Sequence, residues 1–369
     1  MSEAAAPATT ATTPLFDPTG RLNATAFTRG ARSVLATLAG SVVSAVTLAP
    51  DLRAALHAAA DSAARRGSPR IAEDDLLPAL LRERLIGQDD AVDRLAPHLH
   101  AAARGLAAGF RWADRPRSVL LLCGPPGTGK TLTARLIAEA VHGTADALAV
   151  VDVGRPATPE GLTARLAAAL APGPRRVLLL DDVDRADPHL LDCLLPLLDE
   201  GRVAGAGHDA RDCVVVLTAG LRPPLDAEDL LPRGPGADSP LRRALGVRLR
   251  PELLDRVDEV IPFAPFGPSE LRALTESALH RLDGRLRTQL GARLVWDASA
   301  ADRLARAAWS TTANPSGGNA RDVERAVHAL VPRLLARLDE AAQPGGGVLR
   351  LTCAEHAPAP GAVDVSLER

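Results

Sequence analysis

The sequence predicts an α/β fold in which a parallel sheet flanked by helices is followed by a smaller helical region. Ser118–Cys123, Leu148–Val153 and Val177–Asp182 are short apolar runs, typical of strands buried on both faces of a sheet. Helical patterns separate these runs along the chain. A glycine-rich loop joins the first run to a helix, which is the third sign of this fold class.

The composition limits the possible classes of function. The length of 369 residues allows two or three domains, and 46% apolar residues allow a sizeable core. A net charge of −2 provides no global basic field, so we do not expect a nucleic-acid partner. The four cysteines lack metal-ligand spacing and predict free thiols in a reducing compartment. No signal peptide and no apolar run of membrane-spanning length is found, so we expect a cytoplasmic protein.

The sequence divides into four expected parts. Residues 1–24 predict a disordered tail, because they are small, polar and proline-bearing. The other parts are a helical region over 25–80, a large α/β domain over 81–265, and a small helical lid with a C-terminal strand and tail over 266–369.

The loop between the first strand and its helix has the pattern G-x-x-x-x-G-K-T. Its glycines let successive backbone N–H groups point at phosphate oxygens, and the helix that follows directs its positive end at the same place. Lys130 is the only lysine in the chain, and a compact ammonium at the phosphates is poorly replaced by arginine. A chance match is the alternative, but the flanking strand and helix favour a nucleotide site. The residues assigned to nucleotide binding here are Gly124, Pro125, Pro126, Gly127, Thr128, Gly129, Lys130, Thr131 and Leu132.

Two acids end the strand over Val177–Asp182. Asp181 is expected to hold Mg²⁺ together with the Thr131 hydroxyl. The alternative is that Asp181 and Asp182 only cap the helical segment that follows. The apolar run before them argues against that alternative.

The rest of the α/β region continues the alternation of helices and strands. Pro159–Leu170 predicts a helix, and Asp184–Arg202 predicts another with its leucines facing inward. Cys213–Thr218 predicts a buried strand, and residues 222–240 predict an irregular loop. The inward leucines are Leu190, Leu191, Leu194, Leu195 and Leu198.

The C-terminal region is predicted to be mainly helical. Glu270–Leu290, Ala298–Trp309 and Ala320–Leu338 have helical patterns, and Ser316–Gly318 separates the last two. Val348–Thr352 is expected to be a closing strand, with frayed residues after it.

These motifs together resemble the AAA+ ATPases, in particular the second ATPase module of the Clp chaperone family. The resemblance rests on RERLIGQDDA at Arg82–Ala91, the G-x-x-x-x-G-K-T loop, Asp184–Arg202 and RPELLDRVDEVIPF at Arg250–Phe263, and it covers residues 82 to about 340. It implies ATP and Mg²⁺ as ligands and places Ile86 and Gly87 in the adenine pocket. Residues 52–81 also resemble one repeat of the Clp N-terminal domain, although a generic helical hairpin fits nearly as well.

The resemblance also assigns two arginines. Arg256 matches the arginine finger that reaches the γ-phosphate of a neighbouring subunit, and Arg250 is a second candidate. The alternative for Arg256 is a surface salt bridge with Glu252 or Asp255. Arg321 matches the sensor-two arginine, which contacts the γ-phosphate within its own subunit, or is an ordinary arginine on a helix surface.

Three departures from the family pattern are visible. Asp182 stands where the family has the glutamate that polarises the attacking water, and Gly220 stands where it has an asparagine that orients this water. We expect Thr218 to compensate in part, and hydrolysis to be slow. The segment over 152–177 lacks the aromatic pore-loop residue with which Clp modules grip polypeptide.

The sequence therefore favours an AAA+ ATPase that hydrolyses ATP slowly to remodel or assemble a protein partner. We expect a hexameric homo-oligomeric ring, no membrane, and a protein substrate or adaptor recruited through the N-terminal region. One alternative is a non-hydrolysing switch or scaffold that assembles when ATP binds. A protein-threading unfoldase is the other alternative and is disfavoured by the missing pore aromatic.

Overall fold

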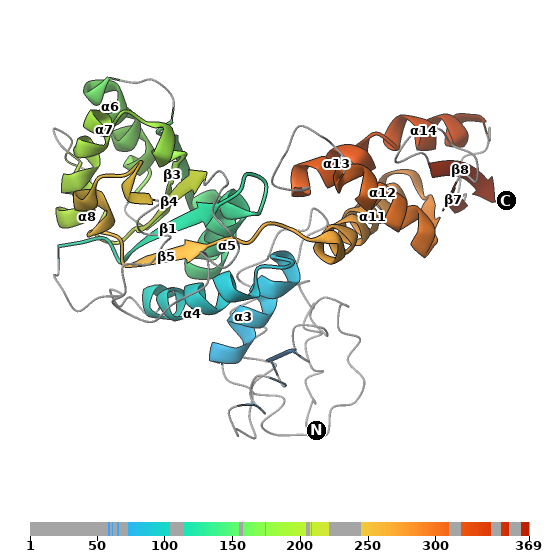
Figure 1. Ribbon diagram of the computed structural model, residues 1–369, viewed down its shortest axis with the longest axis horizontal. Coiled ribbons are helices and arrows are strands. Elements are labelled where there is room, and N and C mark those ends of the chain that lie inside the picture. Colours follow the sequence, from blue (N-terminus) through green and yellow to red (C-terminus); the bar gives the residue numbers. More distant parts are fainter. Residues whose placement is uncertain are drawn as a thin grey trace, which may run out of the picture.

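The computed structural model contains an α/β core and a smaller C-terminal region (Figure 1). The predicted N-terminal tail and most of the predicted helical region over 25–80 lie outside the residues that the structure describes. The described residues are 58, 59, 61, 65, 73–103, 114–154, 158–173, 175–203, 207, 209–220, 245–309, 319–340, 348–353 and 363–368.

The core is built on a parallel five-stranded sheet with the strand order β2-β3-β4-β1-β5. The strands are β1 (Ser118–Gly124), β2 (Leu148–Asp152), β3 (Val177–Asp181), β4 (Val214–Gly220) and β5 (Glu259–Pro262). Because the strands are parallel, all five carboxyl ends lie at one edge of the sheet. This edge carries the glycine-rich loop after β1.

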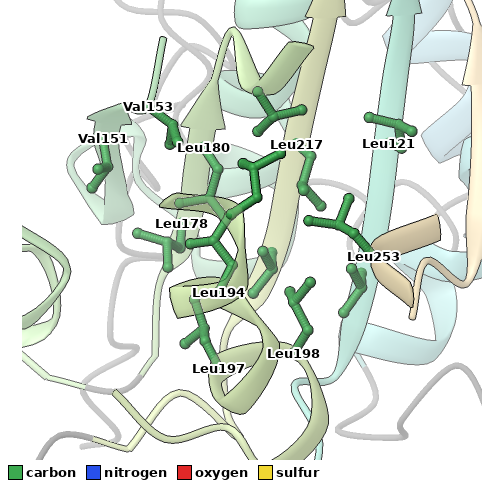
Figure 2. Packing of buried hydrophobic residues seen from close by; sticks show 14 of the residues in the cluster. Leu121, Val151, Val153, Leu178, Leu180, Leu194, Leu197, Leu198, Leu217 and Leu253 are labelled. Carbon is green, nitrogen blue, oxygen red and sulfur yellow. The ribbon is translucent and has the colours of Figure 1, made fainter. Parts of the chain in front are cut away.

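Helices cover both faces of the sheet. One face packs against α4 (Asp89–Ala103) and α5 (Lys130–His142), and α3 (Glu73–Arg84) packs against α4 (Figure 1). The other face packs against α6 (Pro159–Leu170), the helical segment over 183–200 and α10 (Pro251–Leu254), and Figure 2 shows the leucines and valines that meet there. The unbroken apolar runs follow from this arrangement, because both faces of each central strand are buried. The predicted α/β fold class is confirmed.

The segment predicted as one helix over Asp184–Arg202 is divided into short helices, so that prediction is wrong in detail. They are η2 (Val183–Arg185), α7 (Pro188–Leu191), η3 (Asp192–Leu194) and α8 (Leu195–Glu200). Pro196 has no N–H to donate to a preceding carbonyl, which accounts for the break before α8. Leu195 is only partly buried, and Leu197 faces the core in its place.

The lid, defined here as the chain from α11 to β8, has its own apolar core. It contains α11 (Pro268–Leu290), α12 (Ala298–Trp309), α13 (Ala320–His328), α14 (Val331–Glu340) and a sheet of β6 (Arg293–Trp296), β7 (Val348–Cys353) and β8 (Val363–Glu368). The sequence predicted one helix where α13 and α14 stand. Pro332, at the second position of α14, cannot donate a hydrogen bond to a carbonyl of the preceding turn, so the helix is interrupted there.

The strands of the lid were mostly missed by the sequence prediction. Only β7 was expected, and the residues predicted to be frayed include β8, which pairs antiparallel with β7. Among the helices that the structure describes, none has the length and hydropathy of a segment that crosses a bilayer.

Candidate functional site

The phosphate loop, defined here as residues 124–130, joins β1 to α5. Gly124 and Gly127 have φ angles of 150° and 77°, values that side chains rarely tolerate. A Cβ atom at Gly124 would lie 2.5 Å from the carbonyl oxygen of Phe263. A Cβ atom at Gly127 would lie 2.7 Å from the Cβ of Asn319. These two glycines therefore let the loop pass close to two segments that come much later in the chain.

Lys130 is the first residue of α5 and is only 9% exposed. Its Nζ donates hydrogen bonds to the carbonyl oxygens of Gly124 and Pro125, each at 2.7 Å. Burial lowers the pKa of Lys130 to about 8, and the carboxylates of the 181–184 segment act in the opposite direction. An ammonium has three N–H donors, so one remains for an anionic ligand.

The remaining loop residues surround this lysine. The buried Thr128 hydroxyl donates to the carbonyl oxygen of Pro125 at 2.9 Å and braces the loop. Pro126 and the Thr131 side chain are exposed, whereas Leu132 packs against the core. The exposed hydroxyl of Thr131 stands at the positive end of α5, where anions are favoured.

The acidic edge, defined here as Asp181, Asp182, Asp184, Thr218 and Gly220, lies at the carboxyl ends of β3 and β4. Gly124 and Gly220 are register partners in β1 and β4, so this edge adjoins the phosphate loop. Thr218 is 1% exposed, and its hydroxyl donates to Asp181 Oδ1 at 2.5 Å. The same hydroxyl accepts the backbone N–H of Asp182 at 3.0 Å. Thr218 therefore fixes both acids at the carboxyl end of β3.

Asp182 has a φ angle of 57° and is the one non-glycine residue with positive φ in the described part of the chain. Its Oδ2 lies 3.1 Å from a guanidinium nitrogen of Arg185. Burial raises the pKa of Asp182, and Arg185 acts in the opposite direction. Gly154 follows β2, and a Cβ atom at this position would lie 2.9 Å from the Cβ of Asp182. Glycine at 154 therefore leaves room for the left-handed backbone at Asp182. The predicted alternative of a capping acid is not supported, because the Asp182 side chain makes no capping hydrogen bond.

Asp184 is a site residue that the sequence reasoning did not single out. Its Oδ1 accepts the backbone N–H of Gly220 at 2.9 Å, and its side chain is partly buried. A Cβ on Gly220 would lie 3.7 Å from the Asp184 Oδ2 atom. The acid spacing in Asp-Asp-Val-Asp was the only sequence signal that could have indicated it.

Ile86 and Gly87, predicted to line the adenine pocket, lie in a turn between α3 and α4. A Cβ on Gly87 would lie 2.5 Å from the Cγ of Glu270, near the start of α11. Gln88, which was not predicted, is 3% exposed and pairs through both ends of its amide with the backbone N–H and carbonyl of Ala264, each at 3.0 Å. The turn is thus fastened to the segment that connects the core to the lid.

The lid meets the phosphate loop at the start of α13. The backbone N–H of Ala320 donates to the carbonyl oxygen of Gly127 at 3.1 Å. The Asn319 side chain caps α13 by accepting the N–H of Asp322. Arg321 follows at once, is exposed, and has no hydrogen-bond or ion-pair partner among the described residues. An arginine at this place can reach a ligand on the loop without first breaking another contact.

Arg256 lies at the opposite, amino-terminal edge of the sheet. Arg256 precedes β5, and the neighbouring Asp258 donates its N–H to the carbonyl of Val119 near the beginning of β1. Since a strand rises about 3.3 Å per residue, the loop after β1 is roughly 16 Å further along the strand. Arg256 therefore does not belong to the phosphate site of its own chain.

Arg256 and Arg250 both make ion pairs within the chain. Arg256 Nε lies 2.6 Å from Asp199 Oδ2, and its guanidinium also donates to the backbone carbonyl of Glu252. Arg250 is bound to both carboxylate oxygens of Asp192 at 2.9 Å. Within a single chain, Arg256 therefore does form a salt bridge, as the alternative prediction stated. Its partner is Asp199, however, and not the side chain of Glu252 or Asp255.

The donor atoms at the acidic edge and at the start of α5 suit Mg²⁺. Thr131 offers a hydroxyl and Asp181 a carboxylate, and Mg²⁺ prefers such oxygens and takes its other ligands from water and phosphate. Within the described residues, no group of three or more His, Cys, Asp or Glu side chains forms an all-protein metal cluster. The residues therefore fit a magnesium ion that arrives with a nucleotide better than a permanently held metal.

Comparison with known proteins agrees with this geometry. Residues 115–260 match the family model "AAA domain (Cdc48 subfamily)". The chain is 31% identical over 277 residues to the chaperone protein ClpB of Pseudomonas putida, an alignment that covers 70% of this chain and 31% of the relative. It is 34% identical over 252 residues to chaperone protein ClpB 2 of Parasynechococcus marenigrum, covering 62% of this chain and 27% of the relative. The chain spans about a third of the length of these curated relatives.

Proposed function

Because the chain carries an AAA+ ATPase domain related to the Clp chaperones, we propose that it binds ATP with Mg²⁺ and hydrolyses it slowly to remodel or assemble a protein partner. The observation that carries the proposal is the convergence of three segments on one edge of the sheet. The phosphate loop, the acidic edge and the start of α13 meet there through the Gly124–Gly220 register and the contact between Ala320 and Gly127.

Different residues at this edge bind different parts of the nucleotide. The loop N–H groups and Lys130 bind the β- and γ-phosphates, while Ile86 and Gly87 line the adenine side. Thr131 and Asp181 hold Mg²⁺, which when bound neutralises charge on the phosphate oxygens. Arg321 contacts the γ-phosphate from the lid, so that the lid angle responds to the nucleotide.

Hydrolysis needs a positioned water and a place for its proton. The water oxygen forms a bond to the γ-phosphorus, the bond from this phosphorus to the bridging oxygen of ADP breaks, and Asp182 takes the proton. Thr218 fixes the position of Asp182 through its backbone N–H. The short side chain and the Arg185 ion pair hold the carboxylate back from the phosphate, which supports a slow rate.

The arginine finger requires a neighbouring subunit. Arg256 stands at the amino-terminal edge of its own sheet, so only a phosphate bound to another copy comes within its reach. This supports a ring, which we take to be hexameric, with ATP at the contact between two copies. Arg250 stays the second candidate for this role.

The protein partner is proposed to bind through the N-terminal region over residues 25–80. The support comes from the Clp-like pattern over 52–81 and from the chaperone names of the relatives. Deletion of residues 1–72, which ends before α3, should abolish partner binding while leaving ATP binding intact. Partner binding that survives this deletion would refute the assignment. The cytoplasmic location and the domain boundaries stay predictions.

A second candidate function is a switch that binds ATP to assemble and does not hydrolyse it. The short acid at Asp182 and the missing side chain at Gly220 favour this candidate, because both leave the attacking water poorly positioned. Threading of a polypeptide stays disfavoured, because the 152–177 segment has no aromatic residue.

The deciding experiment measures ATP turnover by the full chain beside Lys130→Ala. Loss of the ammonium should abolish turnover and weaken binding of a fluorescent ATP analogue at least about a hundredfold, since charge-assisted hydrogen bonds to phosphate are lost. Arg135→Ala, an exposed change on the same helix, is the matched control and should retain both activities.

Two outcomes contradict the preferred function. Binding of the analogue with turnover no higher than the Lys130→Ala blank supports the switch. Failure to bind the analogue at all refutes both candidates.

A further inference from the structure

Gly220, at the carboxyl end of β4, has no side chain that could orient water. A polar group from another segment, the Asp184 carboxylate, lies beside it. The N–H of Gly220 donates to Asp184 Oδ1 at 2.9 Å. The Oδ2 atom of the same carboxylate lies 3.7 Å from the place where a Cβ of residue 220 would stand. The Asp184 carboxylate therefore lies over the position from which a longer residue at 220 would project.

Asp184 is also close enough to act on the residues of the phosphate site. Burial lowers the pKa of Lys130, and Asp184 is among the carboxylates that act against this shift. Burial likewise raises the pKa of Asp182, and Asp184 contributes in the same direction. The negative charge of Asp184 is therefore felt at both residues, in agreement with its place at this edge of the sheet.

The two oxygens of Asp184 have different surroundings. Oδ1 is anchored by the backbone N–H of Gly220, and no hydrogen bond reaches Oδ2 within the described part of the chain. Asp182 differs, because its Oδ2 is paired with Arg185. An acceptor oxygen without a partner, held beside the phosphate loop by a backbone contact, suits a water molecule as its ligand.

We propose that Asp184 is a catalytic residue of this chain, whose Oδ2 accepts a hydrogen bond from the water that attacks the γ-phosphate. The proposal rests on the proposed ATPase function and supplies the water-orienting group that Gly220 lacks. Asp184 forms no covalent bond; Asp182 takes the proton, and ADP departs as described above. The group that orients the water thus comes from the segment after β3, and not from the end of β4.

Asp184→Asn separates this role from a structural one. The amide oxygen can still accept the Gly220 N–H, so the end of β4 keeps its contact, but the NH₂ group faces the water with donors and cannot accept its hydrogen. We expect kcat to fall about a hundredfold, the usual scale for losing one positioning group. Binding of a fluorescent ATP analogue and the thermal midpoint should stay unchanged.

Three further variants make the test more specific. Asp187→Asn makes the same change at an exposed acid three residues away and should leave kcat unchanged. Asp184→Ala removes the carboxylate and should lower kcat as Asp184→Asn does. Adding Gly220→Asn to Asp184→Ala should restore part of the lost rate, because the vacated space can take the amide of residue 220.

The outcomes are distinct from those of the proposed function. Turnover within about twofold of the unmodified chain in Asp184→Asn, with Lys130→Ala inactive, overturns the role of Asp184 and leaves the ATPase proposal standing. Equal loss of analogue binding and kcat also overturns it, since that pattern indicates a structural role. No turnover in the unmodified chain overturns both the hydrolytic function and this inference.

Discussion

The phosphate loop and the acidic edge adjoin each other, yet they differ in how closely they follow the pattern of related ATPases. Every position of the loop carries the expected residue, and Lys130 is buried and bonded to two loop carbonyls. The acidic edge has a shortened acid at 182, a glycine at 220 and an acid at 184 that contacts this glycine. In the proposed function, nucleotide binding and nucleotide hydrolysis therefore depend on different segments and can change separately.

This difference has a structural basis. The loop is fixed mainly by its own backbone and by α5, whose first turn follows directly in sequence. The acidic edge is assembled from the ends of two strands that Thr218 connects through hydrogen bonds to both Asp181 and Asp182. Changes at the acidic edge should therefore alter the rate of turnover more than the affinity for ATP.

The largest expected effect comes from Thr218→Val, which keeps the shape and removes the hydroxyl. Asp181 loses its donor and the Asp182 N–H loses its acceptor, so we expect kcat to fall about a hundredfold with little change in ATP affinity. The buried N–H left without a partner should lower the free energy of unfolding by about 1–3 kcal/mol. Steady-state kinetics and thermal unfolding measure the two effects.

Thr275→Val is the matched control for that change. Thr275 is equally buried in the lid, where its hydroxyl donates to the carbonyl of Leu271 at 2.8 Å. Its substitution should leave turnover unchanged. If Thr218→Val weakens ATP affinity as much as kcat, binding and hydrolysis are not separable at this edge.

An intermediate effect should appear in the pH dependence of binding, which tests the loop side of the comparison. The pKa of Lys130 is lowered to about 8, mainly by burial, so the ligand-free protein loses this positive charge as the pH rises above that value. Bound phosphates favour the ammonium, which places the pKa of the complex higher. Affinity should therefore be constant below pH 8 and fall by about tenfold for each pH unit above it, until the pKa of the complex is reached.

Titration with a fluorescent ATP analogue at a series of pH values measures this dependence. The Lys130→Ala protein should bind weakly with no change over the same range. A flat profile in the unmodified chain would contradict the assignment of Lys130 as the phosphate ligand with a lowered pKa.

The smallest expected effect is that of Asp182→Glu, which moves the carboxylate forward by one methylene. We expect kcat to rise a few-fold, because the base comes nearer to the water. The left-handed backbone at this position tolerates aspartate better than glutamate, so stability should fall by about 1 kcal/mol. Turnover and the thermal midpoint are measured together, with Asp146→Glu as the control at an exposed acid.

The same variant discriminates the two candidate functions. A remodelling enzyme should gain partner remodelling along with turnover, whereas a switch should gain turnover and lose its ATP-stabilised assembly. A decrease in kcat would instead indicate that the geometry of this edge is already fitted to aspartate.

Local sequence signals determined much of the fold. α6 and α12 have the bounds that their helical periodicity predicted, and β1 to β4 are found where unbroken apolar runs predicted buried strands. These signals depend on residues a few positions apart, so the chain reveals them without tertiary information. Pro196 and Pro332 are also local signals, because a proline inside a helical pattern predicts a break such as those found at α8 and α14.

The sequence by itself determined that the chain has a phosphate loop followed by a helix, and that acids end the strand expected beside it. The tertiary structure decided which side chains meet there. Thr218 and Asp182 are 36 residues apart, as are Asp184 and Gly220, and Gln88 reaches Ala264 across 176 residues. Such contacts depend on strand order and register, which are set by packing of both sheet faces at once and leave no local pattern in the sequence.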